Sequence, residues 1–356
     1  MRNHSDVTSA FQGLPHIVNA SADAAESVSV VIPCYNEANF IRKVLENLAD
    51  QYESDRYEII VVDGRSEDRT REEIEAFKST RPELSVVLVD NPARQIPAAL
   101  NLGVAVARGE IIARMDAHAV PSDGYVRRCV EVLRQADAGV VGMPCHVLPG
   151  ADTLLARAIA NAVSHPFGIG DAKYRLSKGA ALQESVDTVA FSCFRKSLWQ
   201  ELGGFNESLL TNEDYDFNYR VRSAGRDVIL DRSGHCDYFA RTSFGELATQ
   251  YRRYGGWKAR MIRLHPRSIK LRHLVAPVFV LSLAGLLILS LFWPPFAILL
   301  SLEIGLYVFL ALAFSWQIMQ RDKGGLGILL MLPLVFLTIH LTWGTSFLLG
   351  LVREPR

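Results

Sequence analysis

Two polar side chains stand one residue apart, directly after an apolar run. The sequence EIIARM at 110–115 predicts a buried strand, and Asp116 and His118 follow it. Side chains separated by one residue on an extended segment point the same way. A carboxylate and an imidazole placed in this way can share a divalent cation with a diphosphate and so neutralise a leaving group. Asp116 and His118 therefore predict a metal site at a strand end.

A lone carboxylate ends another apolar run. Asp63 closes the sequence IVVD at 60–63 and is followed by Gly64. A carboxylate here is costly to bury unless it is exposed or accepts hydrogen bonds. At the ligand edge of a sheet it can accept them from a nucleobase or a ribose. Taken alone, however, Asp63 is better explained as a helix-capping or turn residue.

Two adjacent carboxylates, Glu213 and Asp214, open a predicted helix in the sequence NEDYDFNYR. Backbone N–H groups and the helix dipole stabilise negative charge at this end of a helix. Adjacent helical residues do not share a face, so the two carboxylates should have separate roles. Ordinary N-terminal capping is the simpler explanation while the pair is taken without its context.

The sequence QYRRY at 250–254 is basic and aromatic. Arg253 can pair with a pyrophosphate, because a guanidinium matches phosphate geometry. A surface charge that faces lipid headgroups is the alternative, and it remains credible for Arg252.

Short apolar runs and amphipathic stretches alternate from Ser27 to Ile112. We predict four strands and three helices here, the strands at 28–34, 58–63, 85–89 and 110–113 and the helices at 38–51, 67–78 and 96–108. This alternation predicts a parallel, right-handed α/β sheet. Such sheets bind ligands at the carboxyl ends of their strands, which would bring Asp63 and Asp116 to one edge.

The pattern is less regular further along the chain. Helices are predicted at 123–135, 195–202 and 213–224, and one strand at 139–147. Gly, Ser and Pro interrupt any regular hydrophobic periodicity over 148–190. We therefore expect a loop-rich stretch there, on the side of the site that would take an acceptor substrate.

The C-terminal part is strongly apolar. Residues 274–302 and 324–352 are two uncharged runs of 29 residues each. A membrane crossing needs roughly 20 apolar residues. We therefore predict spans at about 274–293, 296–319 and 326–351, the second interrupted by Glu303. Because Pro333 and Gly344 interrupt the third segment, it could be re-entrant rather than a straight span.

Charge along the chain predicts the orientation of these spans. Between Ala248 and Leu302 there are eight Lys and Arg residues and no Asp or Glu, and 321–323 is basic again. Positive residues favour the cytoplasmic side and attract anionic headgroups. We therefore expect a multi-pass protein of the cell inner membrane with a cytoplasmic catalytic domain. The predicted parts are a polar segment at 1–26, a catalytic domain at 27–240, a basic interfacial neck at 241–273 and a transmembrane region at 274–352.

Composition narrows the possible partners. Lys+Arg and Asp+Glu both number 38, and this balance argues against nucleic-acid binding. The five cysteines are scattered without zinc-site spacing and are expected to be buried thiols. No apolar signal-peptide core lies in the first 26 residues.

Taken together and in order, these motifs resemble family 2 glycosyltransferases with the GT-A fold, a mostly parallel, Rossmann-like mixed sheet. Within that family the likeness is to ExoA-type glucosyltransferases of bacterial exopolysaccharide assembly, and it covers about Ser27 to Trp257. The motifs that carry it are VIPCYNE at 31–37, VVDG at 61–64, DAH at 116–118, GGFNE at 203–207, NEDYDFNYR at 212–220 and QYRRY at 250–254.

The resemblance implies roles for the donor side of the site. The residues expected around the nucleotide are Pro33, Tyr35, Glu37, Asp63 and Asp116, with Asp63 on uracil. Asp116 and His118 match the family's metal and diphosphate motif, which implies a divalent cation, Mn²⁺ or Mg²⁺. His118 stands where an Asp is commoner, so the preferred metal is left open.

The resemblance also implies roles for the catalytic and acceptor side. Asp214 matches the family's catalytic base. The residues expected to serve the diphosphate or the acceptor are Glu213, Gln250, Arg253 and Tyr254, and Tyr254 replaces the Trp of the family's QxxRW motif. This replacement, with only three candidate spans, argues against a processive enzyme that extrudes a polymer.

The expected reaction is an inverting transfer from a nucleotide sugar, UDP-glucose, to a hydroxyl of a lipid-linked saccharide. One alternative is a polyprenyl-phosphate sugar synthase, against which the motif at Gln250–Tyr254 argues. Another is a catalytically silent nucleotide-binding scaffold in the membrane, against which intact Asp63, Asp116 and Asp214 argue.

Overall fold

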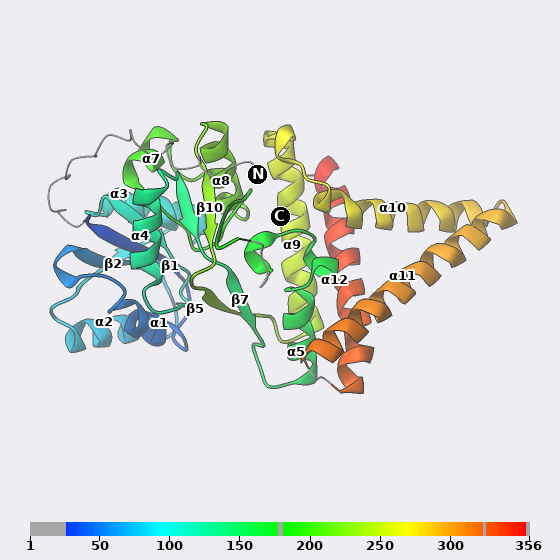
Figure 1. Ribbon diagram of the computed structural model, residues 1–356, viewed down its shortest axis with the longest axis horizontal. Helices are drawn as coiled ribbons and strands as arrows, with labels where there is room; N and C mark the ends of the chain where they lie inside the picture. Colours follow the sequence, from blue (N-terminus) through cyan, green and yellow to red (C-terminus); the bar gives the residue numbers. More distant parts are fainter. Residues whose placement is uncertain (1–25, 177–180, 323–324, 354–356) are drawn as a thin grey trace, which may run out of the picture.

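A computed structural model describes residues 26–176, 181–322 and 325–353. The predicted polar segment at 1–26 lies outside the described residues except for Glu26. The chain forms an α/β domain followed by long apolar helices that extend to one side of it (Figure 1).

The first half of the central sheet confirms the predicted alternation. Four parallel strands lie in the order β3-β2-β1-β4, where β1 is Val28–Cys34, β2 Tyr57–Asp63, β3 Ser85–Asp90 and β4 Ile111–Arg114. The intervening helices are α1 (Ile41–Leu48), α2 (Thr70–Thr80) and α3 (Ile96–Val106). All of β2 and nearly all of β1 are buried, which explains their continuous apolar runs.

Helices cover both faces of this sheet. One apolar core lies under α1, α2 and α4 (Tyr125–Gln135), and the other under α3, α7 (Lys196–Glu201) and α8 (Glu213–Ser223). The α3 backbone approaches β1 closely at Gly103, where an added Cβ would lie 2.4 Å from Val31 Cγ1. The sheet is therefore held rigidly between two helical layers.

The second half of the sheet is mixed. Strand β9 (Cys193–Arg195) runs antiparallel between β4 and β6 (Val140–Gly142), β10 (Val228–Asp231) runs parallel to β6, and β8 (Gln183–Ser185) closes the edge. A smaller sheet has the order β5-β11-β7, with β5 at Ala119–Pro121, β11 at Cys236–Phe239 and β7 at Cys145–Leu148. The fold is thus the predicted mostly parallel mixed sheet.

Two predictions for the middle of the chain were wrong. The single strand predicted at 139–147 is two strands in different sheets, β6 and β7. The break falls at Pro144, which has no N–H to continue a strand ladder. The stretch predicted to be loop-rich contains helix α5 (Leu154–Ala162), which Thr153 caps by accepting from Ala156 N, and the short helix α6 (Pro166–Ile169).

The predicted neck is mostly one helix, α9 (Phe244–Leu264), of 21 residues. Three helices that are long and apolar enough to cross a membrane follow it, α10 (Arg272–Ser290), α11 (Pro294–Asp322) and α12 (Leu326–Val352). They match the predicted spans within a few residues. The interruption at Glu303 links two of them, because Ser282 Oγ of α10 donates to Glu303 Oε1 of α11 at 2.5 Å.

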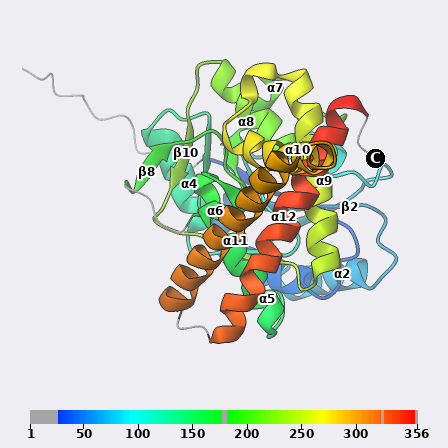
Figure 2. The same cartoon turned by 90° about the vertical axis from the view of Figure 1, so that its right-hand side faces the viewer.

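The last helix runs along the catalytic domain. Figure 1 shows α12 beside α9, whereas α10 and α11 project outward. In the orthogonal view α10 is seen nearly end-on while α12 still runs lengthwise (Figure 2), so α12 is steeply inclined to α10.

Glycines permit the close contact between α9 and α12. A Cβ at Gly255 of α9 would lie 2.4 Å from the carbonyl oxygen of Trp343, and one at Gly350 of α12 would lie 2.9 Å from Ala259 Cβ. Ser346 Oγ also donates to Arg252 O at 2.5 Å. Small residues let helix backbones pack closely, so α12 is joined to α9 along its length.

We predict that Gly255→Ala separates α9 from α12 and destabilises the protein. The added methyl group meets a backbone oxygen that cannot rotate away, and such overpacking costs about 1–3 kcal/mol. Thermal unfolding of the full chain in detergent measures the effect. Gly245→Ala is the matched control in the same helix, because an added Cβ there has no neighbour within 4 Å among the described residues. Equal melting temperatures for the two variants would contradict the prediction.

Candidate active site

A buried guanidinium connects the predicted catalytic motifs. Arg114, the last residue of β4, is 6% exposed. Its Nη2 lies 3.0 Å from Asp116 Oδ1 and 3.4 Å from Glu213 Oε1, and its Nη1 lies 3.9 Å from Asp214 Oδ2. Burial alone would lower the pKa of Arg114, but these three carboxylates outweigh it and raise the pKa above its ordinary value. Arg114 therefore stays charged and brings the two predicted motifs together.

The adjacent carboxylates at the start of α8 have different environments, as predicted. Glu213 is buried, and burial together with the charge of Asp214 raises its pKa to about 8, although Arg114 opposes this shift. The side chain of Asp214 is 31% exposed, and its Oδ1 accepts from Tyr215 N at 2.7 Å. Glu213 is therefore protonated at neutral pH, and Asp214 is the accessible carboxylate of the pair.

The residues predicted to hold a metal face the same cavity as Asp214. Asp116 and His118 both line it, and His118 Nδ1 lies 2.9 Å from Glu37 Oε1. Burial would lower the pKa of His118, but the bond with Glu37 and the charge of Asp116 raise it overall. A carboxylate on Nδ1 leaves Nε2 as the ligand nitrogen, which is how metal-binding histidines are usually oriented. The oxygen and nitrogen donors present thus fit a divalent cation.

Other residues predicted to surround the nucleotide lie outside this cavity. Asp63 is fully buried at the end of β2, where its carboxylate accepts from Ser66 Oγ and from Arg71 Nε, each at 2.5 Å. Tyr35 is exposed and its ring lies 5.4 Å from the guanidinium carbon of Arg94. Pro33, at the end of β1, does not line the cavity either. Asp63 thus holds the loop after β2, and contact with uracil stays a prediction.

The predicted motif on α9 has its polar groups engaged within the protein. Gln250 Nε2 donates to Tyr238 Oη at 2.9 Å and to Tyr254 Oη at 3.2 Å. Arg253 donates from Nε to Thr211 Oγ1 at 2.5 Å and from Nη2 to Leu210 O at 2.8 Å. Arg253 therefore fixes the loop that precedes Glu213, and a role on the diphosphate stays a prediction.

Further contacts tie the catalytic helix α8 to the segment that enters α10. Tyr215 Oη donates to Ser268 O at 2.9 Å, and His265 Nε2 lies 2.8 Å from Asp216 Oδ1. Arg272, the first residue of α10, donates to Asp187 and to Asp171. The position of Asp214 is thus coupled to the start of the apolar helices.

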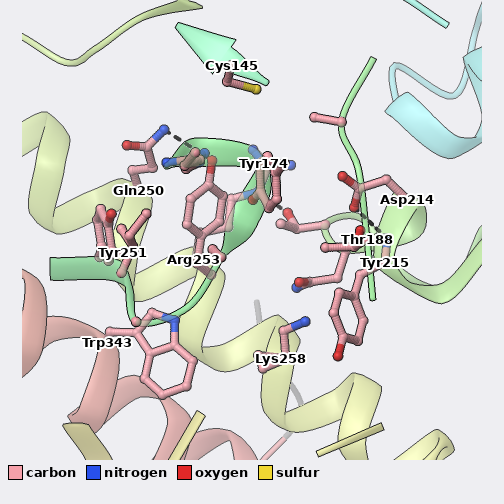
Figure 3. A pocket seen from close by; sticks show the side chains of 18 of the residues that line it. Cys145, Tyr174, Thr188, Asp214, Tyr215, Gln250, Tyr251, Arg253, Lys258 and Trp343 are labelled. Carbon is pink, nitrogen blue, oxygen red and sulfur yellow. Dashed lines mark hydrogen bonds between the residues drawn. The ribbon is translucent and has the colours of Figure 1, made fainter. Parts of the chain in front are cut away.

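One cavity of about 490 Å³ joins these groups. The catalytic end is lined by Arg114, Asp116 and Asp214, and the other end by side chains from α9, α10 and α12. Figure 3 shows Lys258 of α9 between Trp343 of α12 and Tyr215 of α8. The cavity therefore runs from the catalytic carboxylates to the apolar helices.

Arg114, Arg175 and Lys258 all line this cavity, although none of them was assigned to a site from the sequence. Arg114 had a detectable signal, since a charge inside the apolar run EIIARM requires a partner when buried. Lys258 is only 7% exposed, and its ammonium lies 3.3 Å from the centre of the Tyr215 ring. Burial lowers its pKa to about 7, partly offset by the charges of Asp214 and Asp187.

Comparison with known proteins identifies the domain. Residues 29–203 match the model of the family described as Glycosyl transferase family 2. This part of the chain belongs to glycosyl transferase family 2. The match covers Asp63 at the end of β2, Arg114 at the end of β4 and Asp116 after it, whereas Asp214 and Lys258 lie beyond the match.

Relatives extend the likeness across the whole chain. The succinoglycan biosynthesis protein ExoA of Rhizobium meliloti (strain 1021) is 29% identical over 336 residues, covering 92% of this chain and 96% of that protein. A Methanococcus voltae enzyme is 25% identical over 244 residues, covering 66% of this chain and 74% of its own length. Its name describes a glucuronosyltransferase acting on dolichyl N-acetylglucosaminyl phosphate.

A solved structure shares the fold. The mannosyltransferase PcManGT from Pyrobaculum calidifontis, in complex with GDP-Man and Mn²⁺, superposes with a TM-score of 0.62 at 21% sequence identity. The match covers 89% of this chain and 87% of that one, so it includes part of the C-terminal helices. The family 2 domain here therefore has the GT-A glycosyltransferase fold that its motifs predicted.

We predict that Lys258→Met stabilises the free protein. Below pH 7 Lys258 is charged in both the folded and the unfolded chain, so the full cost of burying an unpaired charge is present. Replacing a buried charge by a well-packed apolar group gains about 1–4 kcal/mol. The gain should be largest below pH 7 and shrink as pH rises towards 10.5, where the lysine is neutral in both states.

Thermal unfolding in detergent between pH 6 and pH 10 measures this effect. Lys270→Met is the matched control, because Lys270 is exposed and does not line the cavity. A stabilisation by Lys258→Met that does not vary with pH, or a destabilisation at pH 6, would contradict the assignment of a buried charge.

Proposed function

We propose that the protein is an inverting glycosyltransferase that moves glucose from UDP-glucose onto a hydroxyl of a lipid-linked saccharide at the cytoplasmic membrane face. The observation that carries this proposal is the cavity that joins Asp214 to α10 and α12. A soluble acceptor would not require a catalytic site that opens onto apolar helices. The Methanococcus relative, named for a dolichyl-linked acceptor, supports the same class of acceptor.

The catalytic step assigned to this chain is removal of a proton. Asp214 accepts the proton of the acceptor hydroxyl, which then attacks the anomeric carbon in line and inverts its configuration. Glu213, protonated at neutral pH, adds no second negative charge beside this base. Arg114 holds Asp214 close to Asp116, so the base and the diphosphate-binding residues keep a fixed relation.

The departing diphosphate needs positive charge. Asp116 and His118 would hold a Mn²⁺ or Mg²⁺ ion, which when bound supplies that charge. Glu37 orients His118 for this purpose. Arg253 lies on the same cavity and is the protein's own cation for the diphosphate.

The membrane arrangement follows from the same geometry. We place α10 and α11 in the inner membrane as a hairpin, with α12 alongside α9 at the cytoplasmic surface. The basic residues of α9 and of the start of α10 then lie at the headgroup level, where positive charge is favoured.

Transfer from radiolabelled UDP-glucose tests the proposed function. The full chain in nanodiscs should label a lipid-diphosphate-linked saccharide with inversion, and excess chelator should stop the reaction. A product formed instead on polyprenyl monophosphate would assign the protein to the polyprenyl-phosphate sugar synthases. Labelling of the free saccharide with equal efficiency would show that the apolar helices only tether the enzyme. No transfer to any acceptor would favour a silent scaffold.

We predict that the two adjacent carboxylates differ in their effect on turnover. Asp214→Asn should lower kcat by about 100- to 10,000-fold, because an amide cannot accept the proton. Glu213→Gln preserves the uncharged form of a residue that is already protonated at neutral pH, and should lose far less activity. UDP binding should be unchanged in both variants. An Asp214→Asn enzyme with wild-type kcat, or one that no longer binds UDP, would remove Asp214 from the role of base.

A further inference from the structure

The cavity contains donor groups that lack acidic partners within the described residues. Lys258 of α9, Arg175 before β8 and His273 of α10 all line this cavity. By contrast, Arg272 nearby is fully paired with Asp171 and Asp187. The charge of Arg272 is therefore neutralised by two aspartates, whereas Lys258 has no such partner within the described residues.

Lys258 is the most constrained of these groups. Only 7% of Lys258 is exposed. Within the described residues its ammonium makes no hydrogen bond and no ion pair. Its ammonium lies only against the face of Tyr215. Burying an ammonium without an anionic partner is costly, and this cost remains unless a ligand supplies the partner.

Arg175 shows the same pattern nearer to His118, whose ring lies 6.3 Å from that of Tyr238. Its Nε is buried without a hydrogen-bond partner among the described residues. Its guanidinium carbon lies 5.7 Å from the Tyr174 ring centre and 5.5 Å from that of Tyr238. A guanidinium held by aromatic faces keeps its N–H donors free for an anion.

His273 supplies a neutral donor. Its Nδ1 accepts from Lys270 N at 3.1 Å, which leaves the proton of the neutral ring on Nε2. The ring lies 5.8 Å, centre to centre, from Tyr215, the same ring that Lys258 covers. Lys258 and His273 therefore meet at one aromatic side chain.

The walls beyond this cluster are apolar. Val275 and Ala276 of α10 and Ile339 and Trp343 of α12 line the cavity there, and Val275 is 60% exposed to the outside. A ligand that fits must present a hydroxyl to Asp214, an anion to Lys258 and a hydrocarbon to these helices, in that order. A saccharide joined through phosphate to a lipid has this order of groups.

We propose that Lys258 and His273 bind the phosphate or diphosphate that joins the acceptor saccharide to its lipid. This inference rests on the proposed function and names the part of the acceptor that the site recognises. The donor's own diphosphate belongs to the opposite end, beside Asp116 and His118. The anion site thus selects acceptors by length, because it fixes the distance between the lipid and the sugar hydroxyl that reaches Asp214.

Binding of farnesyl diphosphate tests this proposal without requiring transfer. The full chain in neutral detergent is first saturated with UDP and Mn²⁺, so that the donor site is occupied. The wild-type protein should then bind farnesyl diphosphate at least tenfold more tightly than farnesol. Lys258→Met should remove this preference while leaving UDP affinity unchanged, and Lys258→Arg should retain most of it.

Lys270→Met is the matched control, because it removes one exposed lysine from the same basic segment and should keep the preference. With the lipid-diphosphate-linked saccharide as acceptor, Lys258→Met should raise KM at least tenfold with little change in kcat. A role confined to folding would instead lower the amount of active enzyme and so reduce kcat for every acceptor.

Three results would overturn the proposal. One is equal affinity of the wild type for farnesyl diphosphate and farnesol, and another is an unchanged preference in Lys258→Met. The third is displacement of farnesyl diphosphate by phosphatidylglycerol but not by phosphatidylcholine, which would assign the site to a bilayer headgroup. If the binding results hold and no transfer occurs, the proposed reaction fails and the anion site stands. If transfer occurs and binding ignores Lys258, only the anion site fails.

Discussion

The ion pairs of Arg114 are the interaction on which the active site depends. Three carboxylates approach one another at the edge of the sheet, and close like charges favour protonation of one or more of them. A single guanidinium at the end of β4 contacts all three, at distances of 3.0 to 3.9 Å. Because Arg114 is buried, its attraction for them is screened little by solvent. It keeps Asp214 beside Asp116, while burial and the charge of Asp214 favour the protonated form of Glu213, the most buried of the three.

The same edge of the sheet is also held from the side of the apolar helices. Tyr215 and Asp216 follow Asp214 directly, and both contact the segment between α9 and α10. Arg253 holds the loop before Glu213 from α9. The start of α8 is therefore fixed by β4 on one side and by the base of the apolar helices on the other. The α/β domain and the apolar helices therefore share this packing.

The sequence predicted those features that depend on local pattern. The strands of the first half of the sheet were recognisable because a strand buried on both faces requires a continuous Val and Ile run. The long apolar helices were recognisable for a similar reason. Strand 139–147 was predicted wrongly because the exchange between sheets at Pro144 depends on partners far along the chain. Helix α5 was missed because its buried face is made mostly of alanines, which carry little periodic signal.

The sequence predicted which residue types the candidate site contains, but only some of the contacts between them. Asp116, His118 and Asp214 come together as expected, but the residue that joins them, Arg114, interacts with Glu213 across 99 positions of sequence. Asp63 stands at the expected strand end, yet Ser66 and Arg71 already surround its carboxylate. From the sequence, Lys258 could not be told from the other charges of the basic segment. Its burial involves α12, which packs on α9 and lies almost a hundred residues further along the chain.

The contribution of α12 to the cavity has a consequence for biosynthesis. Ile339, His340 and Trp343 line the cavity, and they belong to α12, which is synthesised after the α/β domain, α10 and α11. Until that helix has been made and has docked on α9, the α/β domain can fold around its sheet, but its site lacks a wall. The order of synthesis therefore delays closure of the cavity until α10 and α11 have already been made, so an enclosed cavity exists only in a chain that carries both of those helices.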